Sequence, residues 1–495
     1  MYSFPHIRDN FKVKLEISNS FCNLTGDIPQ VVTDVLTQVM TYQNDIAAEV
    51  GQLFFQMKLA RRYGNNKKFY AAKAQVEKLQ ANEFVCLYKN QRFPTGLLNI
   101  ALEVFKELNA AVECIDSRQQ PGETAILRWN NMPHEPRYYQ KEMIEFGIES
   151  GRGVFEAAVG SGKSLVLGYL IKHFSCRSLV VVPSVGLSGQ LYNDLSSWFG
   201  TQNVELLDAA KIRKTKKPKA ISIVTVQSLG SLVKSGEFKE FAQHIDALYV
   251  DECHHSGAAT YTSLLNDLDH VFYRFGFSGT FLRNDNKELE MWSFLSNVLY
   301  RYPAHRAIEE GFLTPLTVVM HELHGKPNRK YQAEYDAHYC NNPELLERVS
   351  QIANTYEESQ ILILVNRKDK CGLVIHEWLN SLGIENAYIS GDNSKDEINN
   401  TISAFNEKKI RVLIGSSVLG EGIDVRSTDH LIMAQGGKSE ITIVQAAGRV
   451  LRLYPDKSHA FIHDFRFVGS KFMIKHADER QEIYQRNFNC DITHV

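Results

Sequence analysis

The fold is decided by Val154-Phe-Glu-Ala-Ala-Val-Gly-Ser-Gly-Lys-Ser-Leu-Val-Leu-Gly-Tyr-Leu-Ile171, which predicts a buried strand, a glycine-containing turn and a helix. The turn has the spacing of a phosphate-binding loop, with Ala157 where the strict pattern has its first glycine. Gly160 and Gly162 allow the backbone to curl so that its N–H groups point at phosphate oxygens, and the start of the helix adds a partial positive charge. A Gly-Ser turn that precedes Lys-Ser by chance would explain neither the strand before it nor the helix after it.

Consecutive residues of this turn are predicted to bind a nucleotide, namely Gly160, Ser161, Gly162, Lys163 and Ser164. We expect the Lys163 ammonium to reach the β- and γ-phosphates, and we expect the Ser164 hydroxyl to hold Mg²⁺. The turn therefore predicts a nucleoside triphosphate and Mg²⁺ as cofactors.

Two acidic residues follow a second predicted strand. The apolar run 247–250 ends in Asp251-Glu252-Cys253-His254. A carboxylate at a strand tip beside a phosphate loop can bind Mg²⁺ through water, and an adjacent Glu can orient and deprotonate the attacking water. We therefore predict Asp251 as a magnesium ligand and Glu252 as the catalytic base. His254 and His255 lack a third spaced ligand, so we prefer hydrogen-bonding roles over a zinc site.

Short β-branched runs alternate with helical patterns through most of the chain. They lie at 153–156, 178–183, 220–226, 247–251 and 274–278, and again at 360–366, 386–390, 410–415, 430–434 and 460–464. Strands that are apolar on both faces and alternate with helices predict parallel sheets with helical crossovers. We predict an α/β fold with two tandem parallel-sheet domains, at 126–303 and 304–495, with a ligand-binding cleft between them. Residues 1–125, which close on a Pro-Gly-containing loop, are predicted to form a small α+β accessory domain.

The composition is that of an ordinary globular protein. The 495 residues are 44% hydrophobic and 23% charged, and 55 Lys and Arg nearly balance 57 Asp and Glu. Long disorder, collagen-like repeats and a disulfide framework are excluded, and the balanced charge argues against a tail-driven nucleic-acid binder. The eight cysteines have no Cys-x-x-Cys pair, which indicates reduced thiols. Since neither a secretory signal nor a membrane-spanning apolar run is visible, we expect a cytoplasmic protein without a membrane partner.

These motifs resemble those of the superfamily 2 helicases and occur in that family's order. The phosphate loop resembles motif I, and Asp-Glu-Cys-His resembles motif II. The other matches are Pro136–Gln140 (the adenine-reading Gln motif), Val182–Gln190 and Val224–Leu229 (motifs that touch nucleic-acid backbone), Ser278–Thr280 (motif III), Gly420–Asp424 (motif V) and Gln445–Arg452 (motif VI). The resemblance covers Pro136 to the C-terminus and implies two RecA-like motor domains that hydrolyse ATP with Mg²⁺. Gly279 stands where the family usually has Ala, and because both residues are small we expect little change.

The resemblance also implies roles for individual residues. Further nucleotide contacts are expected from Arg137, Gln140, Gly422, Asp424 and Gln445, and coupling between the ATP and nucleic-acid sites from His254, Ser278 and Thr280. Nucleic-acid backbone contacts are expected from the short polar groups of Ser184, Thr225, Gln227, Asn366, Ser416 and Ser417. Arg452 is the first choice, and Arg449 the second, for the arginine that stabilises the γ-phosphate from the opposite domain. Their i, i+3 spacing places both on one helix face.

The branch within the superfamily is indicated by three further segments. Gly311-Phe-Leu-Thr-Pro315, His463-Asp-Phe465 and Lys475–Tyr484 resemble the UvsW/XPB-like branch, and Cys86–Asp116 resembles the end of the small DNA-binding domain that precedes its motor. UvsW-like enzymes migrate junctions, regress forks and unwind displacement loops or R-loops in recombination, repair or replication. The resemblance therefore implies an ATP-dependent helicase that remodels branched DNA. The alternatives are a restriction-type duplex translocase subunit and, less in keeping with the motifs, an RNA helicase.

Two basic clusters are candidates for contact with DNA. In the first, Arg61, Arg62, Lys67, Lys68 and neighbouring lysines are interleaved with aromatic residues between Phe54 and Lys78. This pattern suits phosphate contact combined with base stacking, although a solvated helix face with core aromatics is an equal alternative. The second cluster, Lys211–Lys219, is predicted to lie on a loop. The expected partners are branched or forked duplex DNA together with single-strand-binding or recombination proteins, in the host cytoplasm if the protein is phage-encoded.

Overall fold

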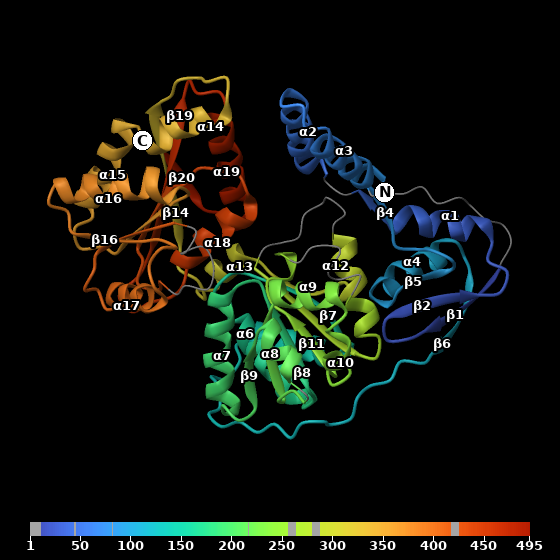
Figure 1. Ribbon diagram of the computed structural model, residues 1–495. Helices are drawn as coiled ribbons and strands as arrows, with labels where there is room; N and C mark the ends of the chain where they lie inside the picture. Colours follow the sequence, from blue (N-terminus) through green and yellow to red (C-terminus); the bar gives the residue numbers. More distant parts are fainter. Residues whose placement is uncertain are drawn as a thin grey trace.

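The computed structural model describes residues 11–43, 46–81, 83–215, 217–255, 264–279, 288–416 and 425–495. Within these residues the chain forms a small mixed sheet followed by two seven-stranded sheets (Figure 1). Every strand pair described in the two large sheets is parallel. The predicted fold, two tandem parallel-sheet units preceded by an α+β unit, is confirmed. None of the helices in the described parts of the chain is long and apolar enough to cross a membrane.

The accessory unit combines a four-stranded sheet of order β5-β2-β1-β6 with a two-stranded sheet, β3-β4. The predicted alternation of residues 11–17 is observed in β1, where Val13, Leu15 and Ile17 are buried. Its elements are β1 (Lys12–Ile17), β2 (Phe21–Thr25), α1 (Gln30–Val39), β3 (Thr41–Gln43), α2 (Ala47–Arg62), α3 (Asn66–Ala81), β4 (Phe84–Cys86), β5 (Arg92–Pro94), the 3₁₀ turn η1 (Thr95–Leu97), α4 (Leu98–Glu107) and β6 (Ala111–Asp116).

The first α/β unit has the strand order β13-β7-β12-β11-β8-β10-β9. Its central strands β7 and β12 are buried along their whole length, as runs that are apolar on both faces predict. The elements are α5 (Tyr138–Ser150), β7 (Arg152–Ala157), α6 (Lys163–Phe174), β8 (Ser178–Val182), α7 (Val185–Phe199), β9 (Val204–Leu207), α8 (Ala209–Lys214), β10 (Ile221–Thr225), α9 (Val226–Ser235), α10 (Lys239–Ala242), β11 (Ala247–Val250), η2 (Cys253–His255), β12 (Tyr273–Ser278), α12 (Glu288–Phe294) and β13 (Val298–Tyr302).

The second α/β unit has the strand order β16-β17-β15-β18-β19-β14-β20. Its elements are α13 (Ala304–Glu309), β14 (Leu316–His324), α14 (Tyr331–Tyr335), the π-helical turn η3 (Asp336–Cys340), α15 (Pro343–Thr355), β15 (Ile361–Val365), the π-helical turn η4 (Lys368–Gly372), α16 (Leu373–Ser381), β16 (Asn386–Ile389), α17 (Lys395–Asn406), β17 (Val412–Gly415), β18 (His430–Ala434), α18 (Glu440–Val450), β19 (Ala460–Val468), α19 (Met473–Phe488) and β20 (Asp491–His494).

The accessory unit is fixed to the first α/β unit by a polar turn between β1 and β2. The Arg152 guanidinium donates to the backbone oxygen of Asn19 at 2.7 Å, and the Arg274 guanidinium donates to Ser20 Oγ at 2.6 Å. Both arginines are buried, so these hydrogen bonds satisfy groups that water does not reach. Leu289 and Trp292 of α12 also pack in the accessory core. The accessory unit and the first α/β unit therefore form one packed body.

Helices α2 and α3 form a hairpin that projects from the accessory unit (Figure 1). The hairpin and the second α/β unit lie on the same side of the first large sheet (Figure 1). The hairpin buries few side chains, among them Ala60, Ala72 and Val76. Its large apolar side chains instead reach solvent, since Tyr63 is 76% and Tyr70 is 65% exposed. The interpretation of a solvated helix face with core aromatics is therefore wrong for these residues.

Two further expectations are corrected. Cys340 and Cys371 are joined in a disulfide rather than being reduced thiols, because the turns η3 and η4 bring their Cα atoms within 4.3 Å of each other. The cluster 211–219 is not simply a loop, because residues 211–214 complete α8. Several of its charges are also occupied within the protein, since Arg213 pairs with Glu237 at 2.9 Å and Lys219 Nζ donates to the Thr201 backbone oxygen at 2.7 Å.

Candidate functional site

The predicted phosphate loop connects β7 to α6 in the geometry that its glycines require. Gly160 and Gly162 have φ angles of +86° and +82°, a conformation that side-chain-bearing residues rarely adopt. Lys163 is the first residue of α6, and its Nζ donates to the backbone oxygen of Ala157 at 3.0 Å. The Lys163 ammonium therefore lies across the loop, at the position from which it can reach phosphate oxygens.

Asp251 and Glu252 follow β11 at the same edge of the sheet as the phosphate loop. Glu252 has a φ of +45°, a rare conformation for a residue other than glycine, and such outliers often occur at functional sites. Its carboxylate accepts from the Gly279 N–H at 3.2 Å and lies 3.5 Å from His254 Nδ1. Burial, together with the neighbouring Glu252 charge, raises the pKa of Asp251, and the Lys163 ammonium opposes this shift.

The predicted coupling residues link motif II to motif III. His254 Nδ1 lies 2.8 Å from the Oγ of Ser278, the last residue of β12. The following residue, Gly279, donates its N–H to the Glu252 carboxylate. A displacement of Glu252 would therefore pull on the backbone at the end of β12 through this hydrogen bond. Thr280, the third predicted coupling residue, lies outside the described residues, as do Ser417, Gly422 and Asp424.

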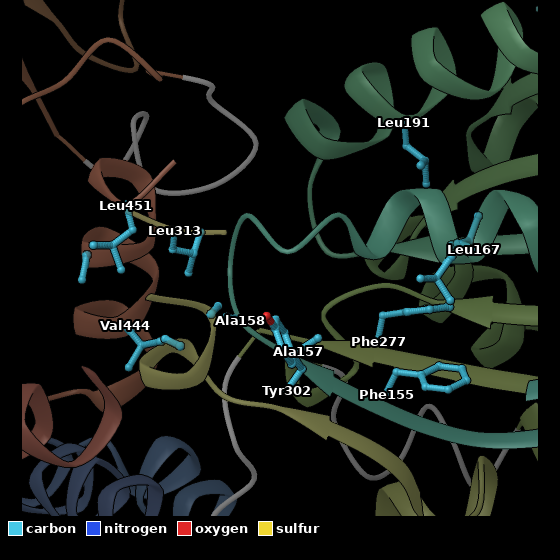
Figure 2. Close-up of a cluster of buried hydrophobic side chains, with 14 of the residues drawn as sticks. Phe155, Ala157, Ala158, Leu167, Leu191, Phe277, Tyr302, Leu313, Val444 and Leu451 are labelled. Atoms are coloured by element: carbon cyan, nitrogen blue, oxygen red, sulfur yellow. The ribbon is translucent and has the colours of Figure 1, made fainter. Parts of the chain in front are cut away.

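The phosphate loop meets the second α/β unit through small apolar groups. The Val159 side chain lies between two glycines, because a Cβ placed on Gly279 would be 2.8 Å from Val159 Cγ2 and one on Gly448 would be 2.4 Å from Val159 Cβ. Figure 2 shows the surrounding contact, in which Val444 and Leu451 face Ala158 and Leu313. An Ala at position 279 would therefore require the Val159 side chain or the loop to move, and the expectation that Gly in place of the family's Ala changes little stays a prediction.

The two candidate arginines occupy different environments. Arg452 lies against the phosphate loop, with its Cγ 3.3 Å from the position of a Cβ on Gly160. Arg449 is buried, with 6% of its surface exposed, in the last turn of α18. Arg452 lies two residues beyond the end of this helix, so the expectation that both arginines lie on one helix face is wrong. Among the two, Arg452 is thus placed beside the loop that would hold the phosphates. Gln445, a predicted nucleotide contact, lies half-buried on the same helix.

Gln140 is tied to the phosphate loop by both ends of its amide. Its Oε1 accepts from the Arg137 N–H at 2.8 Å, and its Nε2 donates to the Ser161 backbone oxygen at 2.7 Å. The Tyr139 hydroxyl donates to the same oxygen at 2.8 Å. The structure therefore gives Gln140 a loop-positioning role in addition to the base-reading role that the resemblance implies. The Arg137 guanidinium lies over the Phe312 ring, 4.6 Å from its centroid.

The linker between the large sheets contributes residues that the sequence analysis did not assign to the site. Leu313 Cδ2 is 3.3 Å from the Cβ position on Gly160, and the Thr314 N–H donates to the Leu451 backbone oxygen at 2.8 Å. The segment Gly311–Pro315 was recognisable only as a marker of the branch. Along the chain this segment lies between the phosphate loop and motif VI, and this order is the one sign in the sequence that it could contact both of them.

The described residues predicted to contact nucleic acid follow the carboxyl ends of parallel strands. They are Ser184 after β8, Thr225 at the end of β10, Gln227 next to it, Asn366 after β15 and Ser416 after β17. Ser184 and Thr225 also cap the helices α7 and α9 by accepting from the Leu187 and Ser228 N–H groups. Ser416 is buried, whereas Gln227 and Asn366 are exposed. The basic side chains of Arg61, Arg62, Lys67 and Lys68 are exposed on the hairpin, which belongs to the accessory unit and not to the two units that carry these strand ends.

The donor set at the loop fits a hard divalent cation. Ser164 is the second residue of α6, after Lys163, and Asp251 supplies a carboxylate whose pKa is raised, so a nearby positive charge would favour its ionised form. Oxygen donors of this kind, with bound water and phosphate, are what Mg²⁺ prefers.

Comparisons with known proteins agree with this geometry. Residues 133–283 match the family model described as "Type III restriction enzyme, res subunit", and residues 344–454 match "Helicase conserved C-terminal domain". The chain is 22% identical to the ATP-dependent DNA helicase uvsW of Enterobacteria phage T4, over 71% of this chain and 75% of that protein. It is 21% identical to the DNA 3'-5' translocase XPB2 of Sulfurisphaera tokodaii, over 64% of this chain and 79% of that protein. A fragment of an HsdR subunit of a type I restriction enzyme from Vibrio vulnificus has the same fold, with a TM-score of 0.57, 19% identity, and coverage of 73% of this chain and 69% of that one.

The contact of Val159 with Gly279 can be tested by adding one methyl group. We expect Gly279→Ala to lower the rate of ATP hydrolysis by about ten-fold, because the added methyl group would displace Val159 and lie 3.2 Å from Lys163 Nζ, and small displacements of catalytic groups cost up to about 100-fold in rate. The double variant Val159→Ala/Gly279→Ala removes the obstructing Cγ atoms and should recover most of the rate, with Val159→Ala as the matched control. A Gly279→Ala protein with the wild-type rate would show that this contact does not constrain the loop.

Proposed function

Because the chain belongs to the superfamily 2 helicases, we propose that it is an ATP-dependent DNA helicase that remodels branched DNA, with junction migration, fork regression and loop unwinding as its reactions. The observation that carries the motor part of this proposal is the position of Arg452. This side chain comes from the second α/β unit and lies against Gly160 in the phosphate loop of the first. ATP held by the loop would therefore touch both units.

The proposed chemistry divides the work between the two units. Phosphoryl transfer places negative charge on the γ-phosphate, and an arginine from the opposite side is worth about 10³–10⁵ in rate in nucleotide hydrolases. Lys163 and Arg452 are the proposed charge-stabilising groups, and Glu252, held by the Gly279 N–H, is the proposed base for the attacking water. Mg²⁺, held by Ser164 and Asp251, would neutralise phosphate charge when bound.

Cleavage of the β–γ bond would remove the anionic bridge between Lys163 and Arg452. The two α/β units would then separate more easily, because the remaining junction around Val159 is apolar and small. Short polar groups at the strand ends of both units, such as Gln227 and Asn366, are exposed for contact with a nucleic-acid backbone. A strand lying across both units would be advanced by each cycle of closing and opening.

The α2–α3 hairpin is the proposed element that grips the branch. Its exposed aromatic side chains, Phe54, Phe55, Tyr63 and Tyr70, are available for base stacking, which is worth about 1–3 kcal/mol per base. The basic residues Arg61, Arg62, Lys67 and Lys68 provide contacts with phosphate. Because the accessory unit is fixed to the first α/β unit, the hairpin would move with that unit during the ATP cycle. Single-strand-binding and recombination proteins are the proposed companions of such a motor.

A restriction-type duplex translocase is the second candidate. It is favoured by the match of residues 133–283 to the res subunit model and by the shared fold with the HsdR fragment. Such a motor would pump duplex DNA without separating strands. The hairpin favours the branched-DNA function instead, because exposed aromatic rings stack on unpaired bases.

The function is tested by ATP hydrolysis and strand displacement on linear, forked, four-way and R-loop substrates. We expect DNA to stimulate hydrolysis, strand displacement to be strongest on branched substrates, and Lys163→Ala to abolish both activities. Equal turnover by wild-type and Lys163→Ala proteins would contradict the motor. Translocation along duplex DNA without displacement on any substrate would favour the restriction-type alternative.

The hairpin can be removed without disturbing the unit that carries it. Gln43 of β3 pairs with Phe84 of β4, so an Asn-Gly turn can replace residues 44–83 and keep both sheets. We expect this variant to lose at least ten-fold in affinity for a four-way junction and much less for linear duplex. Equal losses on the two substrates would contradict the assignment.

A charge-only variant separates phosphate binding from aromatic stacking. Changing Arg61, Arg62, Lys67 and Lys68 to Gln should lower the slope of log affinity against log salt by about 0.9 for each phosphate that these side chains neutralise in the wild type. An unchanged slope would show that these side chains do not touch DNA.

A further inference from the structure

Lys457 lies outside every motif described above, yet its ammonium reaches the backbone of Arg452, just beyond the end of α18. Lys457 Nζ donates to the Arg452 backbone oxygen at 3.3 Å and to the Arg426 backbone oxygen at 3.5 Å. Arg426 follows the segment that resembles motif V, and Arg452 ends the one that resembles motif VI. One side chain thus contacts the backbone at the residues that follow the first of these segments and end the second.

We infer that Lys457 is a positioning residue for ATP hydrolysis, which holds the backbone of Arg452 in place so that its guanidinium faces the phosphate loop. This inference rests on the proposed function. Arg452 lies two residues beyond the end of α18, so its carbonyl has no partner in the helical hydrogen-bond pattern and needs donors from elsewhere. At the end of α18 the Thr314 N–H serves Leu451, and the Thr314 hydroxyl lies 3.4 Å from the Arg452 oxygen. Lys457 supplies the charged donor to that same oxygen.

The surroundings of Lys457 support a fixed ammonium rather than a freely solvated one. The side chain is half-buried, and burial lowers the pKa of Lys457 to about 8, with Arg452 acting in the same direction and the Asp429 carboxylate opposing it. The Asp429 carboxylate is itself fixed, because it accepts from the Gln360 N–H at 2.9 Å. The nearby titratable groups along its own segment are Tyr454, Asp456 and His459. A lysine without a structural task would keep its ammonium in water.

Protonation of Lys457 therefore determines how firmly Arg452 is held. The ammonium has three N–H donors, and its positive charge strengthens its attraction to the two carbonyl oxygens that lie 3.3 and 3.5 Å away. Below about pH 8 a charged ammonium donates to the Arg452 and Arg426 carbonyls. Above about pH 8 the amine is neutral, and its interaction with the two carbonyls weakens. An arginine that acts mainly in the transition state lowers kcat when displaced, with little change in the KM for ATP.

The test measures DNA-stimulated ATP hydrolysis by the full chain between about pH 6.5 and 9.5. We expect kcat of the wild type to fall as the pH rises through about 8, and we expect Lys457→Arg to retain the rate and lose this decline, because a guanidinium stays charged throughout. Lys457→Met should lower kcat about five-fold at pH 7 with the KM for ATP within about two-fold. Lys409→Met, which changes an exposed lysine of the same unit paired with Glu407, is the matched control.

The outcomes separate this inference from the proposed function. A wild type that shows no decline, or a decline of the same size in Lys457→Arg, would overturn the role of Lys457. A folded Lys457→Met protein with the wild-type kcat at pH 7 would overturn it as well. Absence of DNA-stimulated hydrolysis in the wild type would instead count against the motor itself.

Discussion

The van der Waals contact of Val159 with Gly279 and Gly448 is the constraint on which the rest of the site depends. Val159 belongs to the phosphate loop, Gly279 to the segment after β12, and Gly448 to α18 of the second unit. A Cβ on either glycine would lie within 2.8 Å of this side chain. The loop, the segment that holds Glu252 and the helix that leads into Arg452 therefore share one small contact, so that a shift of one of them would affect the other two.

The sequence predicted the chemistry of the site better than its packing. The phosphate-loop spacing and the acidic pair at a strand tip are local patterns, and the structure places both at the same edge of one sheet. The role of Gly279 could not be read in this way, because the side chain that excludes a methyl group there is distant in sequence. The loop-positioning role of Gln140 could not be predicted for the same reason, since its amide meets the Ser161 backbone, which is distant in sequence, only in the folded chain.

The fold was predicted best where strands are central. The runs in β7, β8, β11 and β12 are apolar on both faces, and each was predicted. The edge strands β9 and β13 of the first sheet and β20 of the second were not predicted, nor was the interior strand β14, whereas the remaining edge strand, β16, was predicted. An edge strand is covered on fewer sides, so its sequence is less uniformly apolar, as the half-exposed pattern of β13 illustrates.

The accessory unit is fixed to one half of the proposed motor. Buried arginines hold its β1–β2 turn on the first α/β unit, while Arg452 reaches that unit's phosphate loop from the second. Closing and opening of the units would then move the hairpin relative to the second unit. The central claim is that Arg452 completes the active site across this boundary. Single-turnover ATP hydrolysis by Arg452→Ala, bound to a four-way junction, tests it most directly. We predict a rate about 10³-fold or more below wild type at nearly unchanged ATP affinity, and hydrolysis at the wild-type rate would contradict the claim.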